Sequence, residues 1–174
     1  MKLELRYYGD PILREQCAPV EQFDQQLAEL AEAMVETMFH ERGIGLAGPQ
    51  VGMTKRLIIA LQMKDTDDDN ADALALANPK VLERSRSTWE FEEGCLSIPG
   101  VVGKVVRSEE AVIAYQDVEG NEHTIKARGM FARVLLHEID HLDGRLFVDF
   151  LSSAQKSLIK PELKRIASEL APRR

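Results

Sequence analysis

Two histidines four residues apart, with a glutamate directly after the first, constrain this chain more than any other feature of its sequence. They belong to the pentapeptide His137-Glu138-Ile139-Asp140-His141. On an α-helix, four residues advance about 400°, so both imidazoles lie on one face and can reach a single divalent cation. Glu138 points about 100° away from His137 and can touch a water bound to that cation. The arrangement is typical of metal-dependent hydrolases, with two histidine ligands and a glutamate as general base.

The residues around the pentapeptide favour a helix. Apolar side chains recur at helical spacing, at Phe131, Val134, Leu135, Ile139 and Leu142. Gly144 follows as a residue suited to the left-handed conformation that often ends a helix. We therefore predict a helix over residues 130–142 that carries both histidines. The alternative is a chance occurrence of the pattern, with two histidines that are merely packed.

A catalytic metal centre of this kind needs a third protein ligand and an open position for water. The extended metzincin pattern would place a histidine six residues after His141, but that position holds Phe147. Cys95, in the segment Glu93–Ser97, offers a thiolate, which is a strong ligand for zinc, iron, cobalt or nickel. The alternative is that Cys95 is a small buried hydrophobe, the more common role of a lone cysteine. Cys17 carries no motif, and we interpret it as such a buried residue.

A glycine-rich segment, Gly43–Gly52, matches the literal dinucleotide-binding pattern G-x-G-x-x-G. A dinucleotide site requires this pattern after a strand and at the start of a helix. Here the preceding residues have helical spacing, with Asp24 as a candidate N-cap, and Gly43 ends that helix. Pro49 stands where the dinucleotide helix should be under way. We therefore expect no dinucleotide. The segment is either a flexible turn or a loop whose backbone closely approaches a ligand, with Gln50 as an amide donor.

Taken together, the segments Gly43–Gln50, Glu93–Ser97 and His137–His141 resemble peptide deformylase, a family of hydrolases that remove the N-formyl group from nascent polypeptides. The family's motifs read G-x-G-x-A-x-x-Q, E-G-C-x-S and H-E-x-D-H, and they occur here in that order. The resemblance extends over nearly the whole chain. It implies that the chain is an enzyme acting on N-formylmethionyl peptides, with formate as one product.

The resemblance also implies a metal site. Cys95, His137 and His141 would bind one divalent metal ion per chain, Fe(II) in cells, with zinc, nickel and cobalt as alternatives. Glu138 would be the general base that takes a proton from water and passes it to the leaving amine.

Further site residues follow from the same resemblance. The Gln50 side-chain amide and the Leu96 backbone N–H would stabilise the negative charge that develops on the formyl oxygen. The substrate peptide would lie extended beside Ile44, Gly45 and Gly94 and pair with them by backbone hydrogen bonds.

Two positions depart from the family pattern. The family usually has alanine where this chain has Gly48, and glutamine where it has Leu136. We interpret Gly48 as loosening the loop before Gln50, and Leu136 as removing a polar group next to a metal ligand. The alternative functions are therefore a deformylase-like homologue that binds metal or peptide with weak or altered amidase activity, and a general metallopeptidase. Intact Glu138 and Gln50 argue against the first, and a cysteine ligand argues against the second.

Length and composition fit this interpretation. With 174 residues, we expect positions 1–174 to form a single catalytic domain with a buried core. The two cysteines have no framework spacing, which indicates a reducing compartment. No apolar stretch reaches about 18 residues, and the first residues lack a signal-peptide core, so we expect a cytoplasmic protein without a membrane partner.

The charge is unevenly distributed. Net charge is −7, but residues 156–174 hold six Lys or Arg against Glu162 and Glu169, which leaves that segment at +4 and the remainder at −11. A basic segment on an acidic body can favour contact with nucleic acid. The resemblance likewise implies a transient ribosome contact through this end. The alternative, which we favour, is the solvated face of a helix.

The pattern of elements predicts an α+β fold, with small mixed or antiparallel sheets around a central motif helix and further helices near both ends. We expect an N-terminal helix over residues 25–42 and a C-terminal helix that follows Ser152 and is interrupted or restarted at Pro161. Residues 64–73 read as an acidic exposed loop that lacks the glycine and glutamate of a calcium loop. The strand candidates are residues 56–62, 74–82, 101–107, 110–117 and 122–127.

Overall fold

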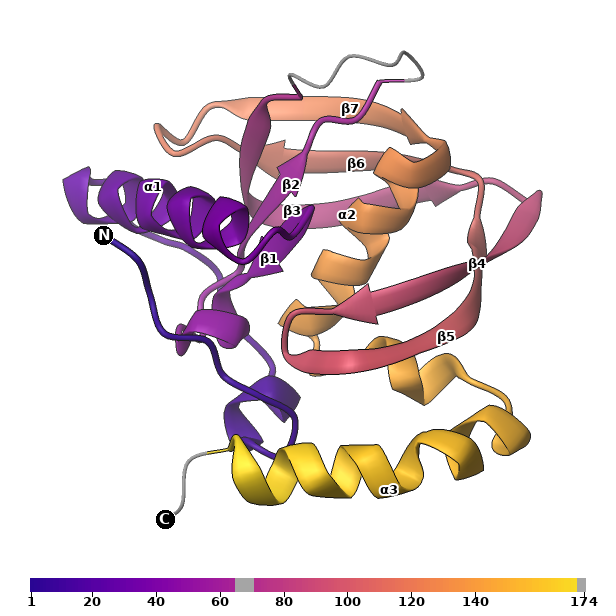
Figure 1. Cartoon of the computed structure of the whole chain (residues 1–174). Coiled ribbons are helices and arrows are strands. Elements are labelled where there is room, and N and C mark those ends of the chain that lie inside the picture. The colour runs from indigo at the N-terminus through magenta and orange to yellow at the C-terminus, as the bar shows by residue number, and fades with distance from the viewer. Residues whose placement is uncertain (65–70, 172–174) are drawn as a thin grey trace.

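The computed structural model describes residues 1–64 and 71–171 of the chain. It has the α+β architecture that the sequence predicts, with antiparallel sheets, three α-helices and three short 3-10 helices (Figure 1). The elements in chain order are η1 (Pro11–Arg14), α1 (Gln25–His40), β1 (Gly45–Ala47), η2 (Gly48–Val51), β2 (Leu57–Leu61), β3 (Ala73–Arg84), β4 (Thr88–Cys95), β5 (Ile98–Ser108), β6 (Glu110–Gln116), β7 (Glu122–Arg128), α2 (Gly129–Leu142), η3 (Phe147–Phe150) and α3 (Ser153–Glu169).

Five strands form one antiparallel sheet in the order β1-β2-β3-β6-β7. Strand β2 is buried on both faces because helices cover it from both sides. Alternation along the strand places Ile58 and Ala60 in a core cluster with residues of α2. It places Leu57 and Ile59 in a second cluster with residues of α1. The sheet is therefore held between the two helices at its β1–β2 end.

Strands β4 and β5 form a separate antiparallel hairpin. Helix α2 runs between this hairpin and the five-stranded sheet (Figure 1). Eleven of its fourteen residues are buried, including both histidines and Glu138. A helix enclosed from both sides must find partners for its polar side chains inside the protein. The motif helix is therefore placed where its polar groups face protein rather than bulk water.

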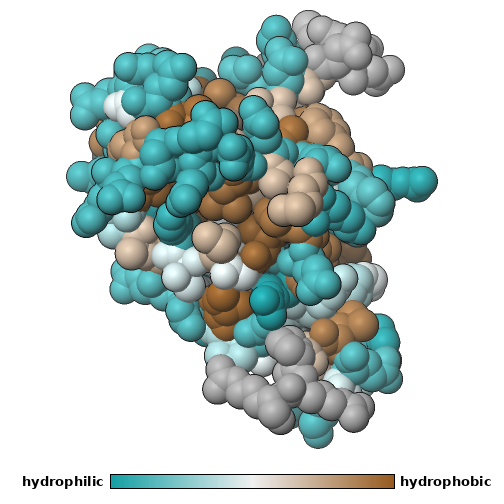
Figure 2. All heavy atoms as spheres, turned by 90° about the vertical axis from the view of Figure 1, so that its left-hand side faces the viewer, coloured by the Kyte–Doolittle hydropathy of each residue, from teal (hydrophilic) through white to brown (hydrophobic). Residues whose placement is uncertain are grey.

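Helix α3 lies beyond the hairpin, at the opposite end of the molecule from β6 and β7 (Figure 1). It packs on a third core cluster that contains Ile98, Val105 and Phe147, and Ile166 is its buried contact residue. The turned view shows hydrophilic surface around a central apolar area (Figure 2). Among the described residues, no helix has the length and apolar character that a membrane crossing requires.

Helix α1 begins and ends with capping interactions. The Asp24 side chain accepts a hydrogen bond from the Leu27 N–H at 3.0 Å, as an N-cap does, so the predicted cap is confirmed. At the other end, the N–H of Gly43 donates to the Met38 carbonyl and the N–H of Arg42 to the Phe39 carbonyl. These two bonds form a Schellman motif, whose left-handed residue is Arg42, with φ of 58°. The helix thus ends at His40, two residues earlier than predicted.

The structure differs from the sequence prediction at several other elements. The five strand candidates are confirmed, but β1 and β4 were not predicted. Helix α3 is continuous, so the predicted interruption at Pro161 is wrong. Ile159, Leu163 and Ile166 pack on the third core cluster on both sides of the proline, and these contacts hold the helix together across the missing N–H. Most of the predicted acidic loop, residues 65–70, lies outside the described residues.

Candidate metal centre

Three potential metal ligands come together where β4 meets α2. Cys95 is the last residue of β4, at a register shift after Gly94, and His137 and His141 are one turn apart on α2. One ligand atom from each residue lies within 4.8 Å of the other two. The Cys95 sulfur is 3.4 Å from Nε2 of His141. One thiolate and two imidazole nitrogens at this separation are a donor set that could hold a divalent ion such as zinc or iron.

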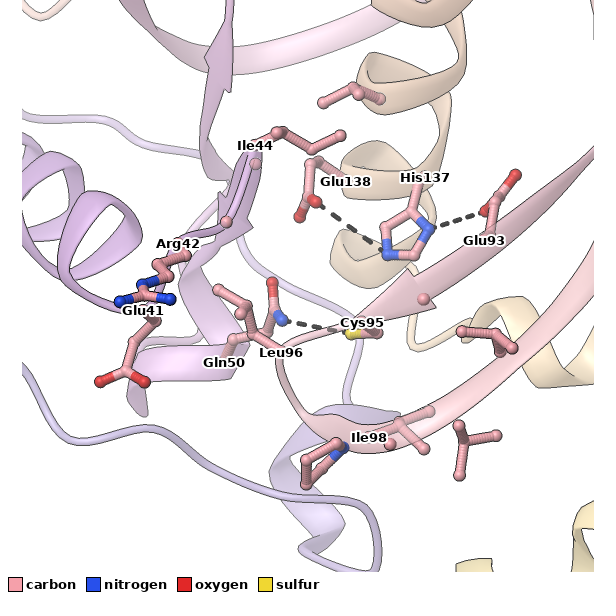
Figure 3. A pocket seen from close by; sticks show the side chains of 18 of the residues that line it. Glu41, Arg42, Ile44, Gln50, Glu93, Cys95, Leu96, Ile98, His137 and Glu138 are labelled. Atoms are coloured by element: carbon pink, nitrogen blue, oxygen red, sulfur yellow. Dashed lines mark hydrogen bonds and ion pairs between the residues drawn. The ribbon is translucent and has the colours of Figure 1, made fainter.

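A carboxylate fixes the orientation of His137. Oε1 of Glu93 lies 2.8 Å from Nδ1 of His137, with both side chains buried (Figure 3). Nδ1 therefore carries the shared proton, and Nε2 remains for a ligand role. Burial opposes the charge of Glu93, but hydrogen bonds from His137 and Arg107 outweigh that effect and lower its pKa to about 2. Glu93 is thus ionised at every pH at which a metal hydrolase works.

Two buried arginines complete the support of Glu93. Arg107 donates from Nε and Nη2 to the two carboxylate oxygens at 2.6 and 2.9 Å, and from Nη1 to Asp140 at 2.8 Å. Arg133 donates to Glu93 at 2.6 Å and to the Val105 and Trp89 carbonyls. Its guanidinium carbon lies 4.4 Å from the centroid of the Trp89 ring. A network of this kind positions the metal-facing histidine through hydrogen bonds that reach both strands of the hairpin.

The sequence analysis did not assign roles to Glu93, Arg107 or Arg133. A signal was present for Arg133 and for Glu93. Arg133 interrupts the apolar run of the motif helix one turn before His137, where a charged side chain requires a buried partner. Glu93 stands two residues before Cys95, the spacing that puts two side chains on one side of a regular strand, and both side chains do contact α2 despite the register shift after Gly94.

The two histidines have different electrostatic surroundings. Burial lowers the pKa of His137, but contacts with Cys95 and Glu93 outweigh that effect and raise it to about 10. Burial, together with the charges of His137 and Arg107, holds the pKa of His141 well below its usual value. The cluster therefore favours one positive charge beside Cys95, and a divalent cation can take the place of that proton.

Glu138 lies beside the ligands but faces differently. Its Oε1 is 4.0 Å from Nε2 of His137, and its Oε2 has no hydrogen-bond partner among the described residues (Figure 3). Burial raises the pKa of this carboxyl to about 7, and the nearby His137 only partly offsets the effect. A Cβ on Gly45 would lie 2.6 Å from Oε1 of Glu138. The glycine therefore allows β1 to pass directly over the carboxylate.

The side-chain amide of Gln50 is held from both ends. Its Oε1 accepts from the Ala47 N–H at 2.9 Å, and its Nε2 donates to the Ser97 hydroxyl at 3.2 Å and points at the Cys95 sulfur at 3.4 Å (Figure 3). Since the Ala47 N–H can only donate, these contacts distinguish the two ends of the Gln50 amide and place its nitrogen on the side of the metal-ligand candidates. The 3-10 helix η2 carries Gln50 into this position.

The two departures from the family pattern have different structural effects from those predicted. Gly48 is buried, and a Cβ there would lie 2.7 Å from the Lys55 carbonyl oxygen, so the backbone before Gln50 is tightly packed rather than loose. Leu136 is buried in the core cluster of α2. His137 is oriented by Glu93 instead, so the apolar Leu136 does not leave that ligand without support.

The remaining predicted residues line one cavity of about 670 Å³ beside the ligands. Ile44 and Gly94 are exposed on its opposite walls, and Gly45 is buried at its inner end. The Leu96 side chain packs under Gly43, where a Cβ would lie 2.7 Å from its Cδ1 atom. Apolar side chains on the walls include Phe91, Val101, Val102, Met130 and Val134. The cavity can therefore accept an apolar side chain close to the metal ligands.

Comparison with known proteins agrees with this geometry. The family model of polypeptide deformylase matches residues 2–157. The chain belongs to the polypeptide deformylase family. It is 48% identical to a peptide deformylase from Picosynechococcus over 149 residues, which are 84% of this chain and 78% of that protein. It is 42% identical to a peptide deformylase from Bartonella tribocorum over 92% of this chain and 90% of the relative.

Solved structures of deformylases have the same fold. The Thermus thermophilus enzyme superimposes with a TM-score of 0.87 at 40% identity and covers 96% of this chain and 98% of its own. The Plasmodium falciparum enzyme superimposes with a TM-score of 0.88 at 34% identity, over 95% and 96% of the two chains. Deformylases are metal-dependent amide hydrolases, and the Cys95, His137 and His141 group is the part of the described chain that could hold the ion. The glycine-rich segment itself forms strand β1 and the 3-10 helix η2.

Proposed function

We propose that this chain hydrolyses the N-formyl group from the N-terminal formylmethionine of nascent polypeptides and releases formate. The observation that carries the proposal is the convergence of five side chains: Gln50, Cys95, His137 and Glu138 line one cavity, and His141 lies directly behind them in the group of metal-ligand candidates. A binding protein without catalytic activity would not need a buried carboxylate beside a metal site with one oxygen that no described residue hydrogen-bonds. The alternative of a non-catalytic homologue is therefore not favoured.

We assign the metal to Cys95, His137 and His141. When bound, a divalent ion supplies Lewis acidity and makes water nucleophilic at neutral pH. We propose Fe(II) as the ion in cells, with zinc, nickel and cobalt as alternatives that suit the same donor set. Glu93 orients His137 so that Nε2 faces the site.

Glu138 is the proposed general base. Its carboxylate lies within reach of a water at the metal site and has an oxygen free to accept a proton. The same group then delivers that proton to the leaving amine. Since burial raises its pKa to about 7, Glu138 can both take up and release a proton near neutral pH.

Gln50 and Leu96 are the proposed donors to the formyl oxygen. Contacts with Ala47 and Ser97 hold the Gln50 amide nitrogen beside Cys95, and the N–H that is directed at the sulfur is the one that would turn to the formyl oxygen. The backbone N–H of Leu96 directly follows the metal-ligand candidate. Preorganised donors of this kind typically contribute about 3 kcal/mol each to the stabilisation of an oxyanion.

The substrate peptide pairs with two open strand edges in this proposal. Strand β1 is an edge of the five-stranded sheet and β4 is an edge of the hairpin, and both line the cavity. An extended peptide between Ile44 and Gly45 on one wall and Gly94 on the other adds a strand to both, as in other β-augmentation complexes. We also propose a cytoplasmic location and a transient ribosome contact through the basic segment 156–174.

The direct test is formate release from formyl-Met-Ala-Ser by protein loaded with Fe(II) without oxygen, with the acetylated peptide as control. We expect turnover of the formyl peptide and at least about a hundredfold lower kcat/KM for the acetyl peptide, because Gly45 and Glu138 leave little room for a methyl group. Stoichiometric metal without formate release would overturn the proposal. Equal rates with both peptides would contradict the formyl selectivity.

A further inference from the structure

We propose that Arg42 selects formylmethionyl peptides that present a carboxylate at their third residue. This inference rests on the proposed function and extends it to the sequence of the substrate. Arg42 lies at the rim of the catalytic cavity, between the end of α1 and Ile44 (Figure 3). It is therefore on the wall along which the peptide is proposed to run.

The backbone of Arg42 is unusual for a residue with a long side chain. Its φ of 58° is in the left-handed region, which glycine or asparagine normally occupies at the end of a helix. A glycine follows directly, at Gly43, yet the left-handed position holds the arginine. The negative end of the helix dipole favours a basic residue here, but His40 already provides one in the last turn. Because Arg42 keeps a rarely populated backbone conformation and its guanidinium lies at the cavity rim, we infer that this positive charge has a role in binding.

The Arg42 guanidinium has no hydrogen bond or ion pair with any residue in the ranges 1–64 and 71–171. Its neighbour Glu41 is held by Lys2 at 2.7 Å and by His40 at 3.2 Å. Arg133, the other arginine of the cavity, is buried and bound to Glu93 at 2.6 Å. Arg42 is thus the cavity arginine whose charge is available to a ligand.

The opposite rim does not cancel this charge. Glu92 of β4 also borders the cavity, but strand alternation places its side chain on the other face of the hairpin from buried Glu93. On that face it stands directly across from Lys104 in the strand register. A carboxylate near Arg42 therefore meets a net attraction.

The distance along the wall identifies the third residue. The reacting end of the substrate lies at Gly45, whose Cβ position is 2.6 Å from the Glu138 carboxylate. Arg42 is three residues before Gly45, so its backbone lies at most about 10 Å from the reacting end, because even a fully extended chain advances only about 3.3 Å per residue and Arg42 stands in a turn. A peptide that runs antiparallel to β1 from this end has its third residue beside Arg42.

A guanidinium binds a carboxylate through paired N–H donors. The carboxylate can be an Asp or Glu side chain, or the terminal carboxylate of a tripeptide. Exposed ion pairs are typically worth about a two- to five-fold change in affinity, and salt weakens them. Because the contact is remote from the reacting bond, it should lower KM and leave kcat unchanged.

The test compares amidated formyl-Met-Ala-Xaa-Ala peptides with Glu, Gln or Lys at Xaa. A second pair, formyl-Met-Ala-Ala as free acid and as amide, separates the terminal carboxylate from the side chain. The variants are Arg42→Asn, which suits the left-handed backbone without charge, and Arg42→Glu, which reverses the charge. Arg86→Gln, at an exposed turn remote from the cavity, is the control for net charge.

For the unmodified protein and for Arg86→Gln at low salt, we expect kcat/KM to be about two- to five-fold lower for the Gln peptide than for the Glu peptide, and lower still for the Lys peptide. The change should be in KM. The difference between the peptides should vanish at about 0.5 M salt. Arg42→Asn should abolish the preference, and Arg42→Glu should reverse it. Equal kcat/KM for the three peptides, with formate released normally, would overturn the role of Arg42. Failure of all peptides to release formate would instead overturn the proposed function.

Discussion

The carboxylate of Glu93 binds Nδ1 of His137 at 2.8 Å and is itself held by two buried arginines. A residue of the hairpin thereby determines how a residue of the motif helix faces the metal site. The orientation of this candidate ligand therefore depends on side chains outside the group that could hold the metal.

Replacement of Glu93 by Gln should weaken metal binding about 10- to 100-fold, because the acceptor that orients His137 loses its negative charge and Arg107 and Arg133 lose the carboxylate that holds it in place. The variant should also be destabilised by roughly 3 kcal/mol, since Arg107 and Arg133 lose a buried counter-charge. Metal competition titration and thermal unfolding measure the two effects. Glu92→Gln, on the outer face of the same strand, is the matched control. Wild-type metal affinity in Glu93→Gln would show that the orienting hydrogen bond is unimportant.

Replacement of Cys95 by Ser should abolish tight metal binding, because a neutral hydroxyl is a much poorer ligand than a thiolate. Elemental analysis after gel filtration measures the metal content. Cys17→Ser is the control, since Cys17 is the other cysteine and is buried in a core cluster without belonging to the group of metal-ligand candidates. Stoichiometric metal with unchanged ligand spectra in Cys95→Ser would exclude Cys95 as a ligand.

Replacement of Glu138 by Gln should retain the metal and lose about 10²- to 10⁴-fold in kcat, the usual contribution of a general base. Formate release by metal-loaded protein is the measurement, with metal content determined on the same sample. Loss of the metal in this variant would indicate that Glu138 is a ligand. Wild-type turnover would remove it from the mechanism.

The contribution of Glu138 to the stability of the metal-free protein should fall as pH rises from about 4.5 to about 7. Burial raises the pKa of Glu138 in the folded state from 4.5 to about 7, so the unfolded chain ionises first over this window. The full destabilisation, up to roughly 3 kcal/mol, is reached above pH 7 and is absent below pH 4.5. Urea unfolding of metal-free wild type and Glu138→Gln at several pH values isolates this carboxyl. Parallel stability curves for the two proteins would contradict the assignment.

The two cysteines should react differently with iodoacetamide. Burial raises the pKa of Cys17 to about 11, which leaves little thiolate at pH 8, whereas Cys95 is only half-buried beside the cavity. In metal-free protein, peptide mapping should find Cys95 modified and Cys17 intact, and added zinc should protect Cys95. Rapid modification of Cys17 in folded protein would show that the core around it opens readily.

The sequence alone was sufficient to predict the local parts of this structure. The spacing of His137, Glu138 and His141 predicts a helix with two ligands on one face, and the structure has that helix at Gly129–Leu142. What could not be predicted depends on tertiary contacts. Strand β1 has only three residues and forms a strand because β2 pairs with it. The charged residues of β4 give no strand pattern in the sequence, and the strand is defined by its pairing with β5.

The partners of the buried charged side chains also could not be predicted from the sequence. Arg133 stands out in an apolar helix, but its carboxylate lies forty positions away in the chain, and no local pattern connects the two. At Pro161 the local sequence pattern gave a wrong prediction that tertiary packing explains. Local propensity predicts a break there, and packing of Ile159, Leu163 and Ile166 on the core overrides it.

The position of the ligand candidates has a consequence for folding. Cys95 ends the hairpin and the histidines belong to the helix that packs on the five-stranded sheet, so an ion bound to all three would fasten the two sheets together. It would close a chain segment of about 40 residues, much as a disulfide does, and reduce the freedom of the unfolded chain by the same kind of loop constraint. The ion would then be a cross-link as well as a cofactor, and folding in a cell short of metal would leave the hairpin as the least tightly anchored part of the enzyme.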